Sequence, residues 1–213
     1  MKTFATFAAV ALSLSLGACV SVLPDPVVPS ALIALPADRA KAPARPLLTD
    51  VSVFPPDSSR AFSGVDIAVR SEQELVYLPD VRWADAAPKV LQGAVVDSLS
   101  KAEGTGNAMS AQQGARVDYD VRWRVIDLSV GKDTLPVKVE VEASLVDAQT
   151  RKVVAQGKFN AEGSPATKSP RDRAAALAIA VQTVADQVAA FAAGAAVPKA
   201  DPLSPTPASP PVR

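Results

Sequence analysis

The chain has 213 residues, no histidine, a single cysteine and equal numbers of basic and acidic residues, 22 of each. Histidine is the usual general base near neutral pH and the commonest metal ligand, so its absence excludes Ser-His-Asp triads, Cys-His pairs and most zinc sites. The balanced charge gives no electrostatic footprint for nucleic acid, and no phosphate-binding glycine loop or nucleophile elbow is present. We therefore expect a protein that is not an enzyme and has no metal or cofactor.

The first 18 residues predict a bacterial lipoprotein signal peptide. Lys2 supplies the positive charge, an apolar stretch follows, and Gly17 and Ala18 are the small residues directly before Cys19. The apolar stretch is too short for an ordinary membrane span, which needs roughly 20 residues. We expect cleavage between Ala18 and Cys19 and lipidation of Cys19, whose thiol becomes a thioether to diacylglycerol. The alternative is an ordinary secretory signal with a chance cysteine near the cut.

Lipidation of Cys19 predicts a protein anchored to a membrane and facing the periplasm. Each buried methylene adds about 0.8 kcal/mol, and two or more acyl chains make the attachment stable. Val20 and Ser21 follow the cysteine. Lipoproteins of the enterobacterial inner membrane carry aspartate there, so the outer membrane is favoured over the inner membrane.

Proline-rich segments flank the predicted domain. Residues 19–30 contain three prolines, which keep the backbone extended, and this stretch is expected to be the tether between lipid and domain. Residues 195–213 are rich in proline, serine and alanine and predict a disordered or polyproline tail. A partner site in this tail is the alternative to a passive tail. The domain itself is expected to cover residues 31–194.

The first half of the domain predicts short strands and one helix. Residues 31–35 and 50–54 are short apolar runs that suit buried strands. The alternation at 65–70 and the apolar run at 75–78 predict a hairpin that ends at Pro79. Asp85 is placed to cap a helix that runs to about Lys101 with one apolar face.

The second half predicts an antiparallel meander and a closing helix. Residues 104–107 are glycine-rich and predict a plain turn, followed by a brief strand at Met109. Apolar and polar residues alternate over 117–125 and again over 137–145, and a third strand follows at 153–159. At Ile126 the apolar parity shifts, which indicates either a bulge or a strand buried on both sides.

The closing helix is predicted to start at Ser169, with Pro170 at its first position. Its apolar stripe comprises Leu177, Val181, Val184, Val188 and Phe191. Taken together, the elements predict a single α+β domain with a mixed, mainly antiparallel sheet and two main helices packed on it.

The order of these elements resembles a known family. The chain presents, in turn, the lipidated cysteine, a short apolar strand, Leu75-Val76-Tyr77-Leu78, Arg82-Trp83, a helix, Tyr119-Asp120-Val121, residues 139–147, Lys152-Val153-Val154 and an alanine-rich closing helix. This order resembles the auxiliary lipoproteins of ABC-type transport systems, the PqiC and YmbA-like family, over residues 31–191. Trp83 ahead of the first helix and Leu145-Val146-Asp147 before a turn match the family pattern. The first strand lacks the family's aromatic residues, and the turn at 148–150 lacks its glycine.

The resemblance implies a non-catalytic auxiliary component of an ABC/MCE-type transport system. Its expected partners are an MCE-type substrate-binding protein and the permease and ATPase of an ABC transporter, and its expected cargo is lipid moving between inner and outer membrane. The alternative is a regulatory lipoprotein that activates a cell-envelope enzyme, but the tether of about a dozen residues spans only about 40 Å when extended. A hydrolase is a third class, disfavoured by the absence of histidine. A homo-oligomer is left open.

Several conspicuous residues have a structural and a functional interpretation. Trp83, Tyr119 and Trp123 are expected in the core rather than at a ligand. A charged stripe is expected to be a solvated sheet face with cross-strand pairs, and a partner surface is the alternative; its members are Asp118, Asp120, Arg122, Arg124, Lys138, Glu140 and Glu142. Glu72 and Glu74 have no neighbouring group that suggests acid-base catalysis. We expect any functional surface at exposed sheet edges and at residues 70–82.

Overall fold

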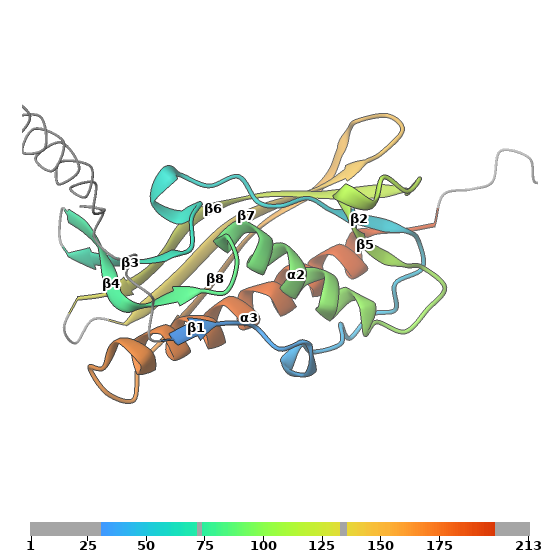
Figure 1. Cartoon of the computed structure of the whole chain (residues 1–213). Coiled ribbons are helices and arrows are strands. Elements are labelled where there is room, and N and C mark those ends of the chain that lie inside the picture. Colours follow the sequence, from blue (N-terminus) through green and yellow to red (C-terminus); the bar gives the residue numbers. More distant parts are fainter. Residues whose placement is uncertain (1–30, 72–73, 133–135, 199–213) are drawn as a thin grey trace, which may run out of the picture.

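The computed structural model describes residues 31–71, 74–132 and 136–198. The predicted signal peptide, Cys19, the tether and the tail from residue 199 lie outside the described residues, as does Glu72. The described chain forms an eight-stranded mixed sheet that curls around two helices, α2 (Ala87–Ser100) and α3 (Pro170–Ala195). Both helices lie on the same face of the sheet (Figure 1). The predicted α+β class is confirmed.

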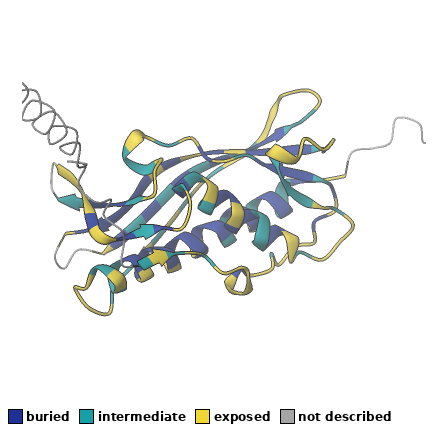
Figure 2. Cartoon of the chain, viewed as in Figure 1, coloured by how far each residue is buried: buried dark blue, intermediate teal, exposed yellow. Residues whose placement is uncertain are grey.

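The predicted meander forms one side of the sheet, with its third strand as the outer strand. Strands β6 (Tyr119–Gly131), β7 (Val137–Asp147) and β8 (Val153–Gly163) pair consecutively and antiparallel. The alternating valines of β6 and β7 point toward the helices, and Val121, Val139 and Val141 are completely buried. The central strands and the sheet-facing sides of the helices form one continuous core (Figure 2).

The second edge of β6 is shared by two groups of short strands. Near its end β6 pairs parallel with β3 (Asp66–Ser71). On its other side β3 pairs antiparallel with β4 (Glu74–Trp83), and β4 pairs parallel with β1 (Ala31–Ile33). Near its start β6 pairs parallel with β2 (Val51–Val53), which in turn pairs with β5 (Ala108–Ser110). The long ladders are antiparallel and the parallel ladders are short, so the sheet is mixed and mainly antiparallel. Three 3₁₀ turns complete the described elements: η1 (Ala37–Arg39), η2 (Arg60–Phe62) and η3 (Ala111–Gln113).

The parity shift at Ile126 is a β-bulge. The register of β6 against β7 slips between Val125 and Asp127, which leaves Ile126 unpaired and 40% exposed. Beyond the bulge Leu128 points into the core, while Asp127 on the opposite face is also buried. Both sequence interpretations therefore hold: the strand has a bulge, and the part after the bulge is covered on both faces.

Helix α3 begins as predicted. The Ser169 hydroxyl accepts a hydrogen bond of 3.1 Å from the Asp172 backbone N–H, which caps the first turn. Leu177, Val181 and Val188 are among its buried residues. The helix has the length and hydropathy of a membrane span, but 61% of the apolar window is buried within the domain. Helix α3 is therefore the core helix of this fold.

The predicted cap of α2 is wrong. The residue at the N-cap position is Ala86, which has no capping side chain, and the helix starts at Ala87. Asp85 instead accepts a hydrogen bond of 2.8 Å from the Ala86 N–H and forms an ion pair of 2.7 Å with Lys89. The Ala87 N–H is satisfied by the Gly64 carbonyl at 2.9 Å. A carbonyl from a distant loop thus takes the place of a capping side chain.

The prediction that the hairpin ends at Pro79 is also wrong, because β4 continues to Trp83. Proline lacks the N–H that a ladder needs, so it is tolerated in strands at edges and irregularities. Here the register of β4 against β3 breaks between Tyr77 and Arg82, and Asp80 adopts a positive φ of 61°. Pro79 lies within this break, where no regular ladder is interrupted.

The three conspicuous aromatic residues lie in the core, as predicted. Trp83 is 1% exposed and closes β4 rather than opening the helix. The Trp123 indole N–H donates to the Phe54 carbonyl at 2.6 Å, and the Tyr119 hydroxyl donates to the Val197 carbonyl at 2.9 Å. Both of these rings are buried while their polar atoms are hydrogen-bonded.

The glycine-rich segment at 104–107 is more than a plain turn. Its backbone runs against that of residues 47–51, with Gly106 N–H donating to the Leu47 carbonyl and Val51 N–H donating to the Asn107 carbonyl, both at 2.9 Å. A Cβ on Gly106 would collide with the backbone of Thr49. The glycines are needed because two backbones approach closely here.

Candidate interaction surfaces

The outside of the described domain has charged, apolar and hollowed surfaces. Within residues 31–71, 74–132 and 136–198, no group of three or more Cys, Asp or Glu side chains is arranged to hold a metal ion. Glu74 is exposed at the start of β4. The described domain has three candidate interaction surfaces: the outer sheet face, the edge of β4 and a groove along α2.

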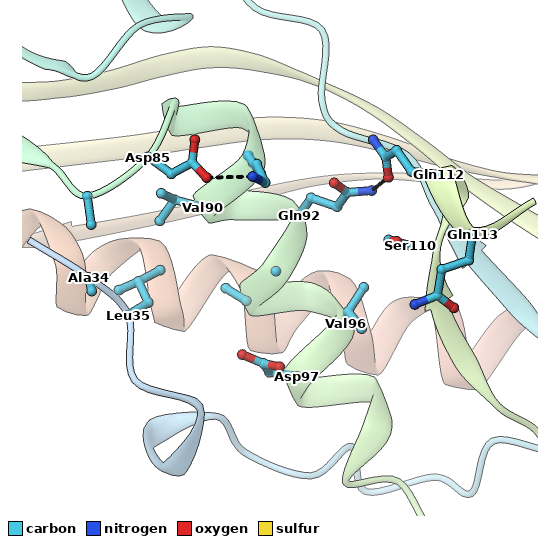
Figure 3. A pocket seen from close by; sticks show the side chains of 14 residues that line it. Ala34, Leu35, Asp85, Val90, Gln92, Val96, Asp97, Ser110, Gln112 and Gln113 are labelled. Carbon is cyan, nitrogen blue, oxygen red and sulfur yellow. Dashed lines mark hydrogen bonds and ion pairs between the residues drawn. The ribbon is translucent and has the colours of Figure 1, made fainter.

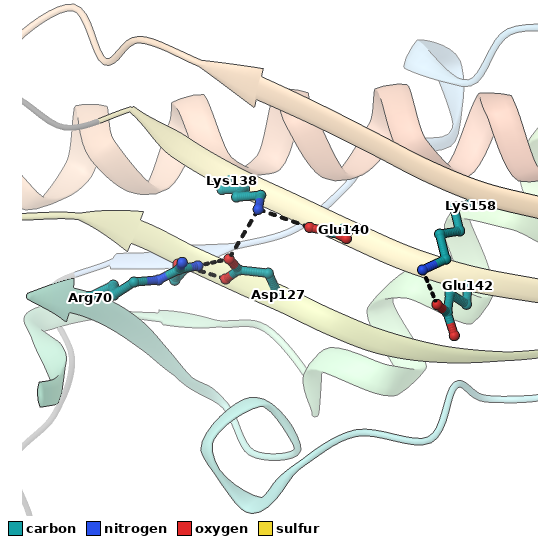
Figure 4. A network of polar contacts seen from close by, with 7 residues as sticks. Arg70, Asp127, Lys138, Glu140, Glu142 and Lys158 are labelled. Carbon is teal, nitrogen blue, oxygen red and sulfur yellow. Dashed lines mark hydrogen bonds and ion pairs between the residues drawn. The ribbon is translucent and has the colours of Figure 1, made fainter. Parts of the chain in front are cut away.

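The outer sheet face carries cross-strand ion pairs. Arg124, Glu142 and Lys158 are direct neighbours on β6, β7 and β8. Glu142 accepts from the Arg124 Nε at 2.8 Å. It also pairs with the Lys158 Nζ at 2.7 Å (Figure 4). The hydrogen bond from Lys158, and then that from Arg124, lowers the pKa of Glu142. The predicted cross-strand pairing is confirmed, and Glu142 is shared by two cations.

The bulge creates a more buried charge cluster on the same face. Asp127, whose side chain is 7% exposed, forms an ion pair with Arg70 and accepts a hydrogen bond of 2.8 Å from the Ser129 hydroxyl. Arg70 also donates to that hydroxyl at 2.9 Å, and Lys138 lies 4.0 Å from Asp127 and 2.8 Å from Glu140 (Figure 4). These side chains line a shallow hollow of about 390 Å³. The cluster is satisfied internally, which is typical of a structural network.

At the other end of this face Asp120 has two cationic partners. The guanidinium groups of Arg122 and Arg151 lie 3.5 and 3.2 Å from its carboxylate. Arg122 also stacks over the Phe54 ring, with 3.9 Å between the guanidinium carbon and the ring centroid. The charged stripe of the sequence is therefore an internally paired sheet face along its length.

The edge of β4 exposes apolar side chains. Leu75, Val76 and Tyr77 are 48%, 52% and 49% exposed. β1 pairs only with residues 81–83 of β4, so in the described chain the earlier part of this edge has no neighbouring strand. An open edge with apolar side chains can accept a strand from another chain. This is the region, residues 70–82, in which the sequence predicted a functional surface.

A groove of about 670 Å³ lies on the outer face of α2 and is called here the α2 groove (Figure 3). One wall is the segment that follows β1, and the other is the segment from β5 to η3. Its lining residues are Ala34, Leu35, Ala84, Asp85, Lys89, Val90, Gln92, Gly93, Ala94, Val96, Asp97, Ser110, Gln112 and Gln113. Most of the lining is apolar, in contrast to the charged sheet face.

The polar groups of the α2 groove are held in defined positions. Gln92 is 4% exposed, and its amide donates to the Val53 carbonyl at 2.7 Å and to the Gln112 side chain at 2.8 Å. This contact ties α2 to β2 and to η3. Asp85 and Lys89 form an ion pair at the start of the helix.

Asp97 differs from the other charged groups of the groove. Partial burial raises its pKa, and the charge of Lys101 only partly offsets this. In the described part of the chain its carboxylate has no hydrogen bond and no ion pair. It is a carboxylate without a direct partner beside an apolar surface.

The sequence did not predict the α2 groove. Its walls come from three segments that are far apart in the chain, so neither periodicity nor spacing marks it. The one local signal is Gly93, a glycine in the interior of a helix.

Comparison with known proteins places this fold in a family. A family model described as the ABC-type transport auxiliary lipoprotein component matches residues 32–189. The chain belongs to this family. The match runs from β1 to α3 and includes all three surfaces, so they are parts of an auxiliary lipoprotein domain. The predicted resemblance is confirmed.

Solved structures support the same fold for this auxiliary lipoprotein. Protein XCC0632 from Xanthomonas campestris aligns with a TM-score of 0.65 and 20% identity over 78% of this chain and 94% of that chain. A second crystal structure, of an uncharacterized protein, aligns with a TM-score of 0.55 and 16% identity over 70% and 97% of the two chains. No curated protein sequence matches the chain.

Proposed function

We propose that the protein is a lipid-anchored, periplasmic, non-catalytic component of an ABC transport system. In this proposal it works with an MCE-type substrate-binding protein and with the permease and ATPase of the transporter, and the cargo is lipid moving between inner and outer membrane. The observation that carries the proposal is the family match over residues 32–189, which follows a predicted lipoprotein signal sequence.

The chemistry of the described surface supports a binding role. The carboxylates that could serve in acid-base catalysis, such as Asp127 and Asp120, are each bound to cations of the same sheet. The chain has no histidine to act as a general base. The open β4 edge and the α2 groove, in contrast, are apolar surfaces of the kind that bind other molecules.

The predicted anchor restricts where a partner can be met. Ala31, where β1 begins, follows Cys19 by only 12 positions. A fully extended chain of this length spans about 40 Å. The domain therefore works close to the membrane that holds its lipid, for which we favour the outer membrane.

Cross-linking in living cells tests this proposal. The full-length lipoprotein with a C-terminal affinity tag is cross-linked in its native cells, purified from solubilised envelopes and analysed by mass spectrometry. We expect an MCE-type protein and the transporter's permease to be recovered above the level found with an untagged strain. Recovery of neither component, from cells that are shown to express both, would contradict the proposal.

A further inference from the structure

We propose that the α2 groove is the docking site for a partner protein of the transport system, which inserts a short apolar segment carrying one lysine or arginine that pairs with Asp97. This inference rests on the proposed function and specifies the surface and the chemistry of the contact. Three features of the groove carry it: a glycine with no packing role, an acidic group without a direct partner, and fixed amide groups at one wall.

Gly93 keeps the floor of the groove open. It is exposed in the middle of α2, and a Cβ at this position would meet no atom within 4 Å outside the helix backbone. Glycine in a helix interior costs about 0.5–1 kcal/mol relative to alanine. Because nothing within the described chain requires the missing side chain, the space above Gly93 is available to another molecule.

Asp97 determines the charge of that molecule. Asp85 and Lys89 form an ion pair, whereas Asp97 lines the groove without an ion pair and feels Lys101 only through its more distant charge. Burial already raises the pKa of Asp97, and an uncharged apolar ligand would deepen that burial without supplying a partner. A basic side chain on the incoming segment would instead form a charge-assisted hydrogen bond.

The opposite wall favours a polypeptide over an acyl chain. Gln112, Gln113 and Ser110 offer amide and hydroxyl groups to the groove, and Gln112 is fixed by the buried Gln92. A peptide backbone can both donate to and accept from such groups, whereas a hydrocarbon chain can do neither. Along the helix the floor from Lys89 to Asp97 extends about 12 Å, which fits two helical turns or a few extended residues.

The test uses the full-length lipoprotein in the cross-linking experiment described above. Gly93→Leu fills the groove floor, and Asp97→Lys reverses the charge. Val154→Lys, which changes an exposed apolar residue on β8 outside the α2 groove and the β4 edge, is the matched control. Thermal unfolding of each purified variant shows that the domain is folded. We expect Gly93→Leu and Asp97→Lys to lower recovery of the transport partner at least tenfold and Val154→Lys to leave it unchanged.

Exchanging the charges of Asp97 and its basic partner residue tests their direct contact. In the wild-type complex the cross-linked peptides should join the segment around Asp97 to an apolar partner segment with a basic residue. Changing that residue to aspartate should restore recovery with Asp97→Lys.

The remaining outcomes separate the two proposals. If the wild type recovers the transport partner and the groove variants recover it equally, the docking site is wrong and the proposed function stands. If the wild type recovers no transport component, the proposed function fails and this docking site fails with it. If the groove variants lose co-purifying phospholipid but keep the partner, the groove holds an acyl chain and the peptide proposal is overturned.

Discussion

At the scale of single residues, alanine substitutions at Gly93 and Gly106 should change the free energy of unfolding in opposite directions. Gly93→Ala should raise the free energy of unfolding by about 0.5–1 kcal/mol, because alanine favours the helix and its Cβ meets open space. Gly106→Ala should lower it by about 2 kcal/mol, because the new Cβ collides with the Thr49 backbone and forces the two segments apart. Urea unfolding of the domain measures both. Equal effects of the two substitutions would contradict this account.

Buried hydroxyl groups give a second prediction at this scale. Thr49 is 7% exposed, and its hydroxyl has no hydrogen-bond partner in the described chain. Valine has nearly the same shape without the polar atom, so Thr49→Val should raise the free energy of unfolding by about 1 kcal/mol. The control is Ser98, which is completely buried and donates to Asp186 at 2.6 Å. Ser98→Ala should lower the free energy of unfolding, and chemical denaturation distinguishes the two directions.

Asp97 makes a prediction about pH. Its pKa in the folded domain is raised above the usual value of 3.8 by burial, so the folded state favours the protonated form. Its ionisation therefore lowers stability as pH rises through a window that begins near the ordinary aspartate pKa. Asp97→Asn should be more stable than wild type at pH 7 and lose this advantage toward pH 3.5. Paired unfolding curves at the two pH values measure the difference, and a constant gap between variant and wild type would contradict the assignment.

At the scale of elements, the bulge at Ile126 predicts unequal roles for two cations. Arg70 pairs with the buried Asp127 and also donates to Ser129, whereas Lys138 lies 4.0 Å from Asp127 and closer to Glu140. Arg70→Ala should therefore lower the free energy of unfolding by about 2 kcal/mol, since it leaves a buried carboxylate with a single distant cation. Lys138→Ala should cost less than about 1 kcal/mol, as for an exposed pair. Thermal unfolding at low and moderate salt compares them, and equal losses would refute the central role of Arg70.

Elements dominated by local patterns were predictable from the sequence. The alternation in β6 and β7, the parity shift at Ile126 and the Ser169 cap of α3 each depend on residues close together in the chain, and the structure contains all of them. The fold class follows from their order. Alternation and helix periodicity predicted these elements because one face of each element packs into the same core.

Elements whose backbone partners are distant were not predictable in detail. The first turn of α2 is satisfied by the Gly64 carbonyl rather than by Asp85, and β4 passes Pro79 because its register is broken there. The α2 groove is the extreme case, since its two walls and its floor come from three separate segments. Of the candidate surfaces, the sequence therefore predicted the β4 edge, which lies within one hairpin, and missed the groove.

At the scale of the whole molecule, one wall of the α2 groove follows the predicted anchor closely in the chain. Leu35, in one groove wall, follows Cys19 by 16 positions. Even a fully extended tether would thus keep this wall within about 55 Å of the membrane surface. A partner segment that docks in the groove must reach the same layer of the periplasm, which is consistent with a component of a membrane transport complex.

The predicted lipid anchor can be tested separately from the fold. Cys19→Ser removes the only thiol of the chain but no residue of the described domain, so the melting temperature of the domain should not change. The variant should lose incorporation of labelled palmitate and move from the membrane to the soluble periplasmic fraction, because two or more acyl chains supply the stable attachment. Cross-linking to the transport partner should also fall, since the anchor raises the effective concentration of the groove near the membrane. A Cys19→Ser protein that still sediments with the envelope would show that attachment depends on a protein contact, for which the open β4 edge would be the first surface to examine.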